Sequence, residues 1–285
     1  MLKEKIFHTG TVELNYAEGP SNGPPLILLH GITTAWQSWL PLIPALAARW
    51  QVFAPDLRGH GKSGRVPGCY RLEDYVADLA AFLLQQVKSP AVVIGHSLGG
   101  LVAIGAAISV PGHIRALVIG DSPMCRESYL DRVDPAYFPA LRDLAASARS
   151  VEEVAAAFAE IRVHSPGTNI SVRQAEIPGN DAAFLRFRAR CLAQTDPEAL
   201  QMIIDGRALH NPDLDLVLSQ VRCPVLLLQA DSIRGALLTD RDVARIVAIL
   251  PNASCVKFAG IGHQLHMENP APVLRAITFF LESLR

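Results

Sequence analysis

Six short apolar segments, separated by helical patterns, constrain the fold of this chain more than any other feature. They are Leu26–His30, Gln51–Pro55, Ala91–Gly95, Ala116–Gly120, Pro224–Gln229 and Ala253–Phe258. Continuous apolar runs of this length are typical of strands buried on both faces of a mainly parallel sheet. Helical patterns such as Leu72–Val87 and Leu98–Val110 lie between them. The alternation predicts an α/β fold with a doubly wound, mostly parallel sheet.

Two further strands are expected near the start of the chain. Short alternating stretches at Ile6–His8 and Val12–Ala17 flank a Gly-Thr turn, a pattern typical of a hairpin. Together with the six apolar segments, the hairpin gives a predicted sheet of about eight strands.

The stretch 124–220 interrupts this alternation. It contains several helical patterns and no convincing buried strand; the patterns are Pro135–Ala148, Val151–Val163, Asp181–Leu192 and Pro197–Leu209. We interpret residues 124–220 as a helical lid inserted into an α/β core formed by residues 1–123 and 221–285.

Composition narrows the range of partners. The net charge is −1 and no basic stripe is present, so a nucleic-acid partner is not expected. The N-terminal segment lacks the apolar run of a signal peptide, and no stretch offers the ~18 apolar residues of a membrane span. The five cysteines form no C-x-x-C pair, which favours a reducing compartment. We therefore expect a cytoplasmic protein with a small-molecule partner, and we leave homo-oligomerisation open.

The strongest chemical signal is a G-x-S-x-G motif centred on Ser97. It follows the apolar run that ends at Gly95 and precedes the apolar helix that begins at Leu98, which is the strand–turn–helix context of a nucleophile elbow. Such a turn strains the serine backbone and brings neighbouring segments close together. Gly95 and Gly99 provide the space. The motif predicts that Ser97 is a nucleophile.

Two backbone amides are candidates for an oxyanion hole. The first belongs to Leu98, at the N-terminus of the helix that follows Ser97, where amides and the helix dipole face developing negative charge. The loop after His30-Gly31 can supply the second, which we assign to Ile32. Only the position of these two residues matters, because the backbone makes the contact.

The motifs taken together resemble the α/β-hydrolase superfamily. His30-Gly31, the DLRGHGKS segment at Asp56–Ser63, GHSLGG around Ser97 and a late G-x-G-H occur in the order and at the separations typical of that family. The resemblance covers essentially the whole chain except the lid. It implies an enzyme with a Ser-His-Asp triad, and it implies a structural role for the DLRGHGKS turn.

The resemblance identifies His263 as the general base. This residue ends the Gly260–His263 segment, after the last apolar strand, where a loop histidine can reach the nucleophile. His266 is the competing residue, three positions later. The family pattern favours His263.

The triad acid is less well specified, because the sequence departs from the family pattern here. Many members end the strand equivalent to Pro224–Gln229 with G-x-x-D, but residue 233 is an isoleucine. Asp231 lies just past that strand and keeps the chain order Ser, Asp, His. We therefore prefer Asp231. Asp121, which follows the preceding core strand, is the alternative acid.

These residues predict a serine hydrolase that cleaves a carboxylic ester or lactone of a small, largely apolar substrate through an acyl-enzyme. A carbon–carbon bond hydrolase, a cofactor-free perhydrolase and an acyltransferase are alternatives on the same triad. A receptor that retains the fold is a hypothesis of a different class. No phosphate-binding loop, dinucleotide motif or metal-ligand cluster occurs, so no cofactor and no metal are expected.

Overall fold

In the computed structural model, an eight-stranded sheet forms the centre of the molecule. The structure describes residues 2–125, 132–164, 171–207 and 214–284. The strands are β1 (Lys3–His8), β2 (Glu13–Glu18), β3 (Pro25–Leu29), β4 (Gln51–Pro55), β5 (Ala91–His96), β6 (Ile114–Gly120), β9 (Val225–Gln229) and β10 (Ala253–Lys257). Their order is β1-β2-β4-β3-β5-β6-β9-β10, and only the β1–β2 and β2–β4 pairs are antiparallel. The predicted mostly parallel sheet of eight strands is confirmed.

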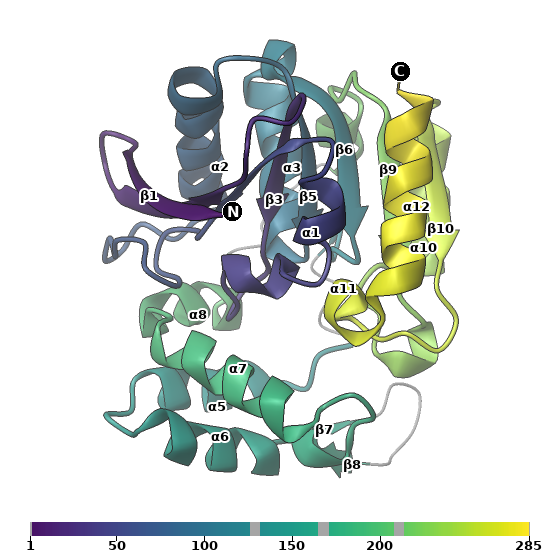
Figure 1. Cartoon of the computed structure of the whole chain (residues 1–285). Coiled ribbons are helices and arrows are strands. Elements are labelled where there is room, and N and C mark those ends of the chain that lie inside the picture. Colours follow the sequence, from purple (N-terminus) through teal and green to yellow (C-terminus); the bar gives the residue numbers. More distant parts are fainter. Residues whose placement is uncertain (1, 126–131, 165–170, 208–213, 285) are drawn as a thin grey trace.

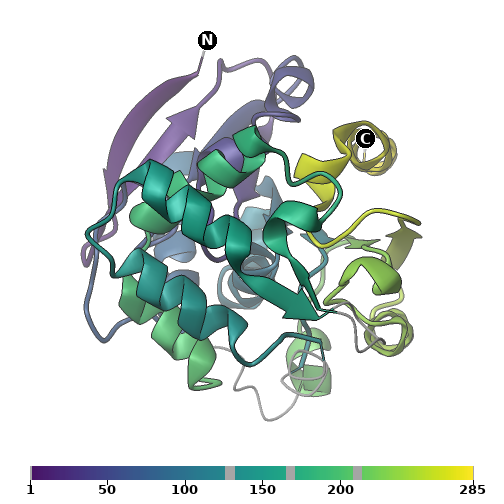
Figure 2. The ribbon, with the colours of Figure 1, turned by 90° about the horizontal axis from the view of Figure 1, so that it is seen from below.

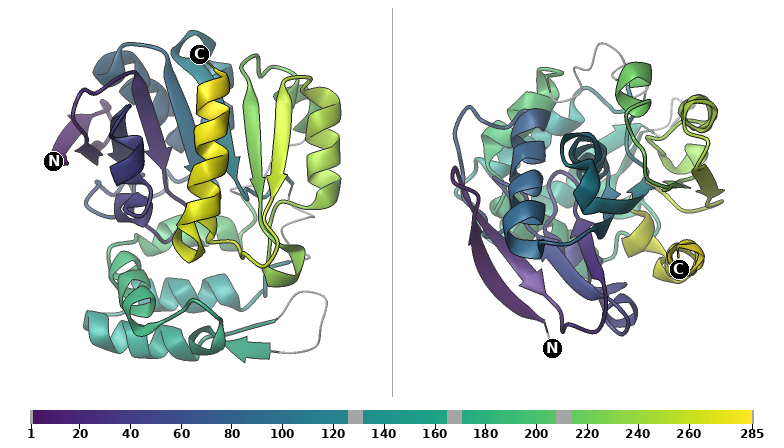
Figure 3. Two further views of the ribbon diagram at one scale, coloured as in Figure 1. Left: turned by 45° about the vertical axis from the view of Figure 1, so that its right-hand side comes forward. Right: turned by 90° about the horizontal axis from the view of Figure 1, so that it is seen from above.

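Helices cover both faces of this sheet (Figure 3). One face packs against α2 (Leu72–Ala81), α3 (Leu98–Ser109) and α10 (Asp240–Ile249); the other packs against the 3-10 helix η1 (Trp36–Trp39), α1 (Ile43–Leu46) and α12 (Pro270–Ser283). Side chains along a central strand alternate between the two faces of the sheet. In β3, Ile27 and Leu29 pack on the face covered by α2, α3 and α10, and Leu26 and Leu28 pack on the opposite face. Among the described residues, no helix combines the length and apolar character of a membrane span.

Between β6 and β9 the chain leaves the sheet and forms a separate group of elements below it (Figure 1). This group, which we call the cap, comprises α5 (Tyr137–Ala145), α6 (Val151–Glu160), β7 (Arg162–His164), β8 (Ser171–Arg173), α7 (Ala182–Ala193) and α8 (Pro197–Ile204). Figure 2 shows its helices side by side from below. The cap has its own apolar core, which includes Leu141, Val154, Phe158, Leu192 and Leu200.

The strands β7 and β8 pair as an antiparallel hairpin, which the sequence pattern did not reveal because each strand has only three residues. The last helix before β9, α9 (Leu214–Leu218), contacts α10, and its Leu218 joins the core beside the sheet. α9 therefore packs with the layer beside the sheet.

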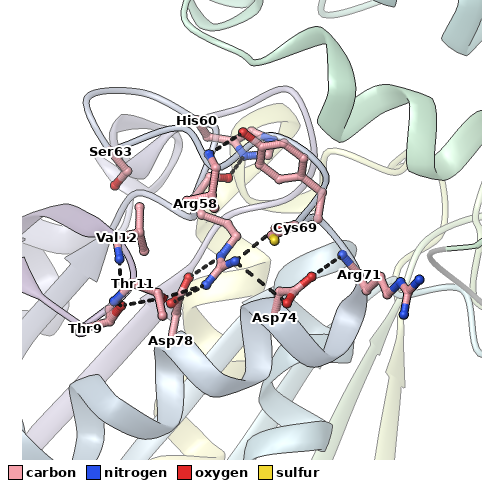
Figure 4. A network of polar contacts seen from close by, with 12 residues as sticks. Thr9, Thr11, Val12, Arg58, His60, Ser63, Cys69, Arg71, Asp74 and Asp78 are labelled. Carbon is pink, nitrogen blue, oxygen red and sulfur yellow. Dashed lines mark hydrogen bonds and ion pairs between the residues drawn. The ribbon is translucent and has the colours of Figure 1, made fainter.

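The DLRGHGKS turn is held by a buried ion pair (Figure 4). The Arg58 guanidinium donates Nε and Nη2 hydrogen bonds of 2.6 and 2.7 Å to the two carboxylate oxygens of Asp78 in α2. Both side chains are at most 5% exposed. The same turn reaches the cap, because Asp196 donates its amide to the Gly59 carbonyl and accepts a 2.6 Å hydrogen bond from the Tyr70 hydroxyl. The turn therefore connects the sheet, α2 and the cap.

Replacing Arg58 by methionine is expected to lower the free energy of unfolding by about 3–5 kcal/mol, because the Asp78 carboxylate would stay buried without its partner. Urea unfolding followed by circular dichroism measures this change. Arg49→Met is the matched control: Arg49 pairs with Glu282 at 2.7 Å on the surface, where such a pair contributes less than about 1 kcal/mol. Equal stability losses in the two variants would contradict the assignment.

Candidate active site

Ser97 occupies a strained turn between β5 and α3. Its backbone angles are φ 53° and ψ −118°, which side-chain-bearing residues rarely adopt. The turn brings backbone segments so close that glycine is required on both sides. A Cβ on Gly95 would lie 2.2 Å from the Gly99 carbonyl oxygen, and one on Gly99 would lie 2.4 Å from the Leu29 carbonyl oxygen. The sequence therefore folds here into a tight elbow that fixes the position of Ser97.

The loop after β3 lies against this elbow. A Cβ on Gly31 would lie 2.9 Å from His96 Nδ1 and 3.1 Å from the Ser97 Cβ, so only glycine allows the approach. Ile32 and Leu98 both line the cavity beside Ser97. Within the parts of the chain that the structure describes, neither residue's amide donates a hydrogen bond to a protein acceptor. Both amides are therefore available to an oxygen atom beside Ser97.

The carboxylate that contacts His263 belongs to Asp121. His263 Nδ1 and Asp121 Oδ2 are 2.7 Å apart, and the Asp121 side chain is fully buried. Asp121 Oδ1 accepts hydrogen bonds of 3.2 Å from the amides of Ala230 and Leu238, and Oδ2 accepts one of 2.8 Å from Leu237. These donors fix the carboxylate, and the carboxylate in turn fixes the His263 ring with Nδ1 as its donor.

The preference for Asp231 as the partner of His263 is wrong. Asp231 begins a 3-10 turn, where its Oδ1 accepts a 3.0 Å hydrogen bond from the Ile233 amide. Its Oδ2 accepts a 2.7 Å bond from the Gly260 amide, which lowers the pKa of this carboxyl group. Asp231 thus anchors the loop that carries His263 and leaves the histidine ring to Asp121.

Two further histidines surround His263. His96 donates from Nε2 to the His263 carbonyl oxygen at 2.8 Å, and its ring lies 4.6 Å from the His263 ring. His266, the sequence competitor, stacks on Trp39 at 4.0 Å. Burial lowers the pKa of His266 to about 3 and holds the pKa of His96 well below its usual value. Both rings are therefore neutral at pH 7, and His96 positions the backbone of His263 without adding charge.

Backbone strain is concentrated around the same point. Among the described residues, four non-glycine positions have a positive φ, and three of them belong to this region: Thr33 at 62°, Ser97 at 53° and Asp121 at 43°. Each lies just past the carboxyl end of a neighbouring strand, β3, β5 or β6. Strained non-glycine residues persist where the surrounding structure fixes them, and they gather at functional sites.

A cavity of about 400 Å³ lies between these strand ends and the cap. The predicted site residues Ser97, His263, Ile32 and Leu98 line it, whereas Asp231 does not. No hydrogen bond joins Ser97 to His263 in the described residues, and such bonds are often long until a substrate binds. The cap contributes aromatic side chains from three helices: Tyr137, Phe138, Phe158 and Phe184. The site is thus a mainly apolar chamber with a serine, a carboxylate-paired histidine and two open amides along one wall.

Most of the chain matches the sequence model of one protein family. The model of the alpha/beta hydrolase family matches residues 26–276, from β3 into α12. The chain belongs to the α/β-hydrolase family. The resemblance of its motifs to that family is thereby confirmed, and the protein is a hydrolase.

Individual α/β hydrolases align along nearly the whole chain. The protein is 27% identical over 281 residues to 2-(acetamidomethylene)succinate hydrolase from Mesorhizobium japonicum, covering 96% of this chain and 93% of the relative. N-formylmaleamic acid deformylase from Pseudomonas putida S16 superposes with a TM-score of 0.78 at 22% identity, covering 97% and 100% of the two chains. The enol-lactonase from Burkholderia xenovorans LB400 superposes with a TM-score of 0.74 at 18% identity, covering 98% and 100%. The two structural likenesses show the fold alone.

One residue of the α/β-hydrolase site was missed from the sequence. Arg188, in α7, lines the cavity although it is only 4% exposed. Its one available signal is helical spacing: it lies three positions after Leu185 and four before Leu192, on the stripe that faces the cap core. A charged residue on an apolar stripe needs a hydrogen-bonding or charged partner, and the sequence alone does not identify that partner.

Proposed function

We propose that the protein is a serine hydrolase that cleaves a carboxylic ester or lactone of a small molecule with a largely apolar body. The observation that carries this proposal is that His263, paired with the buried carboxylate of Asp121, lines one cavity with the strained Ser97 elbow. A buried carboxylate on Nδ1 leaves Nε2 of His263 as the proton acceptor. A pure binding protein would have no use for this arrangement.

In the proposed reaction, His263 takes the proton of the Ser97 hydroxyl as the oxygen attacks the substrate carbonyl. Asp121 orients the ring and stabilises the imidazolium that forms, and it stays ionised. The tetrahedral intermediate collapses when His263 gives its proton to the leaving alcohol. Water then attacks the acyl-serine by the same steps, which releases the acid and restores Ser97.

The amides of Ile32 and Leu98 would receive the oxyanion of the tetrahedral intermediate. Leu98 is the first residue of α3, a twelve-residue helix whose dipole places partial positive charge at this end. Losing one such donor typically costs about 2.7–4 kcal/mol of transition-state stabilisation. The strained backbone at Thr33 and Ser97 holds both amides in place before the charge develops.

The cap serves, in this proposal, as the lid of the reaction chamber. Tyr137, Phe138, Phe158 and Phe184 cover the strand ends that carry the triad. Apolar walls exclude water, which strengthens the electrostatic interactions of the oxyanion and limits side reactions. They also favour a substrate with an apolar body.

Amide hydrolysis is the second candidate, because the relative aligned along 96% of this chain is named for an acetamide-bearing succinate. The same triad serves an amide, provided that His263 protonates the departing nitrogen. The two candidates differ in the leaving group and share every residue of the site.

Turnover of 4-nitrophenyl acetate, 4-nitrophenyl butyrate and 4-nitroacetanilide tests both candidates, with release of the nitroaromatic product followed by absorbance. We expect saturable hydrolysis of both esters, with an initial burst when acyl-enzyme formation outpaces its hydrolysis. Anilide turnover at a comparable rate would make the amide hydrolase the better account. If neither ester nor anilide is hydrolysed, the serine hydrolase proposal fails and a receptor becomes the preferred interpretation.

A further inference from the structure

Arg188 carries a positive charge in the interior of the molecule, beside the proposed reaction site. Its side chain is 4% exposed and lines the cavity. Nη2 donates a 2.7 Å hydrogen bond to the Thr33 hydroxyl, the guanidinium carbon lies 5.6 Å from the centre of the Phe158 ring, and Nε is buried without a partner. The guanidinium is therefore fixed in place by neutral groups and one aromatic ring.

No carboxylate neutralises this charge. Among the described residues, none lies within 4.0 Å of the Arg188 guanidinium. The acidic residues that line the same cavity are engaged elsewhere: Glu176 pairs with Arg173 at 2.8 Å, and Glu268 accepts from the Gly262 amide at 2.9 Å. The third, Asp134, accepts from the Ala136 amide at 2.9 Å.

The other two cavity arginines differ from Arg188 in this respect. Arg234 lies 3.6 Å from the Glu268 carboxylate and donates to the Pro178 carbonyl. Arg132 is half-buried and donates to the Ala236 carbonyl at 3.2 Å. Arg188 is thus the cavity arginine that is fully buried and has no acidic partner among the described residues.

Burying an unpaired charge costs several kcal/mol, and holding the Thr33 hydroxyl does not require a charge. Neutral donors would suffice for the hydroxyls of Thr33 and Tyr137, which both hydrogen-bond Arg188 and leave three of the five guanidinium N–H groups unused. The unused donors point to a ligand with negative charge. A planar guanidinium matches the two oxygens of a carboxylate better than any other side chain does.

We propose that Arg188 binds a carboxylate of the substrate, so that the substrate is an acid as well as an ester or amide. This inference rests on the proposed function for the identity of the reacting group. Thr33 directly follows Ile32, the proposed oxyanion donor, so the carboxylate lies close to the carbonyl that Ser97 attacks. In a monoester or monoamide of a short dicarboxylic acid, the carboxylate likewise lies close to the carbonyl that would be attacked.

A binding experiment tests the carboxylate site without turnover. The Ser97→Ala protein is titrated by calorimetry with monomethyl succinate and with methyl pentanoate, which has nearly the same shape and no charge. We expect monomethyl succinate to bind at least about tenfold more tightly, and Arg188→Met in the same background to remove that preference, in line with the strength of hydrogen bonds to charged groups. Equal affinities for the two ligands in Ser97→Ala alone would overturn the proposal.

Turnover in the wild-type background gives the second readout. Hydrolysis of the same two methyl esters is followed by pH-stat titration, and the ratio of their kcat/KM values is compared among wild type, Arg188→Met and Arg188→Lys. The ratio should fall at least about tenfold in Arg188→Met, mainly through the KM of monomethyl succinate, and Arg188→Lys should recover part of it. Equal losses on both esters would mean that Arg188 only supports Thr33, which overturns the proposal.

Arg186 supplies the matched control. It lies on the same helix, but its side chain is 63% exposed and pairs with Glu152 outside the cavity, so Arg186→Met should leave the ratio unchanged. The two experiments also separate the two proposals. Tight carboxylate binding with no hydrolysis of any ester would overturn the serine hydrolase and support Arg188. Hydrolysis of both esters with no preference for monomethyl succinate would support the serine hydrolase and overturn the carboxylate site at Arg188.

Discussion

Replacing Ser97 by alanine is expected to lower kcat for ester hydrolysis by about 10⁴- to 10⁶-fold. The amides of Ile32 and Leu98 would remain, so a small residual rate above that of water is expected. No other group in the elbow can form the acyl intermediate: the adjacent His96 is buried and hydrogen-bonded to the His263 carbonyl. The rate of 4-nitrophenyl acetate hydrolysis measures the change.

The control for this variant is Ser109→Ala. Ser109 ends the same helix α3 and is exposed, with its hydroxyl donating to the Gly105 carbonyl at 3.0 Å. Its loss should leave kcat unchanged. If Ser97→Ala kept a kcat within tenfold of the wild type, Ser97 would not be the nucleophile.

Replacing Asp121 by asparagine is expected to lower kcat by about 10⁴-fold and also to lower the melting temperature, because the buried Leu237 amide would lose its acceptor. The reason lies in the donors around the carboxylate. Two amides, those of Ala230 and Leu238, require an acceptor at Oδ1 and only the Leu237 amide requires one at Oδ2, so the new NH₂ group would take the Oδ2 position and face His263. That group donates to Nδ1 and selects the tautomer that carries its proton on Nε2, which cannot accept a proton from Ser97.

Asp231→Asn is the matched comparison for Asp121→Asn. Its side-chain oxygen would still accept from one of the two backbone donors, the amides of Ile233 and Gly260, and His263 would keep Asp121, so a change in kcat of no more than about threefold is expected. The same ester assay applied to both variants decides between the two acids. A large loss for Asp231→Asn together with a near-normal Asp121→Asn would reverse the assignment.

The position of Ser97 could be predicted from the sequence, whereas the carboxylate that contacts His263 could not. Ser97 could be predicted because its signal is local: a strand, two glycines and an apolar helix within about twenty residues. Asp121 and Asp231 both follow strands that lie side by side, because β6 pairs in parallel with β9. Each aspartate therefore emerges at the same edge of the sheet, and the sequence pattern does not distinguish them.

The register of β6 and β9 determines which of the two aspartates contacts His263. Gly120 pairs with Leu228, and the chain of β9 continues past that pair so that the Ala230 amide reaches Asp121. Asp231 then points to the Gly260 amide of the next loop. A positive φ at Asp121 turns its carboxylate toward His263, and the Gly120–Pro123 sequence, which is typical of a turn, does not specify that direction.

The cavity wall around Arg188 could not be predicted from the sequence. The helices of the cap could be predicted from their periodicity, but Arg188 contacts Thr33 across 155 positions of the chain. Such a contact depends on how α7 docks over the loop after β3, and periodicity within one helix holds no information about docking. The cavity wall that carries Arg188 therefore came from the structure, whereas the proposed nucleophile and base came from the sequence.

Activation of Ser97 by His263 and Asp121 would make this serine reactive toward a fluorophosphonate. The wild-type protein is treated with a fluorophosphonate, which transfers its phosphonyl group to an activated serine with loss of fluoride, and the product is analysed by intact mass and peptide mapping. We predict one adduct per chain, located on Ser97, no adduct in Ser97→Ala and much slower labelling in Asp121→Asn. An unlabelled wild-type protein, or an adduct on another residue while Ser97 stays unmodified, would show that Ser97 is not an activated nucleophile.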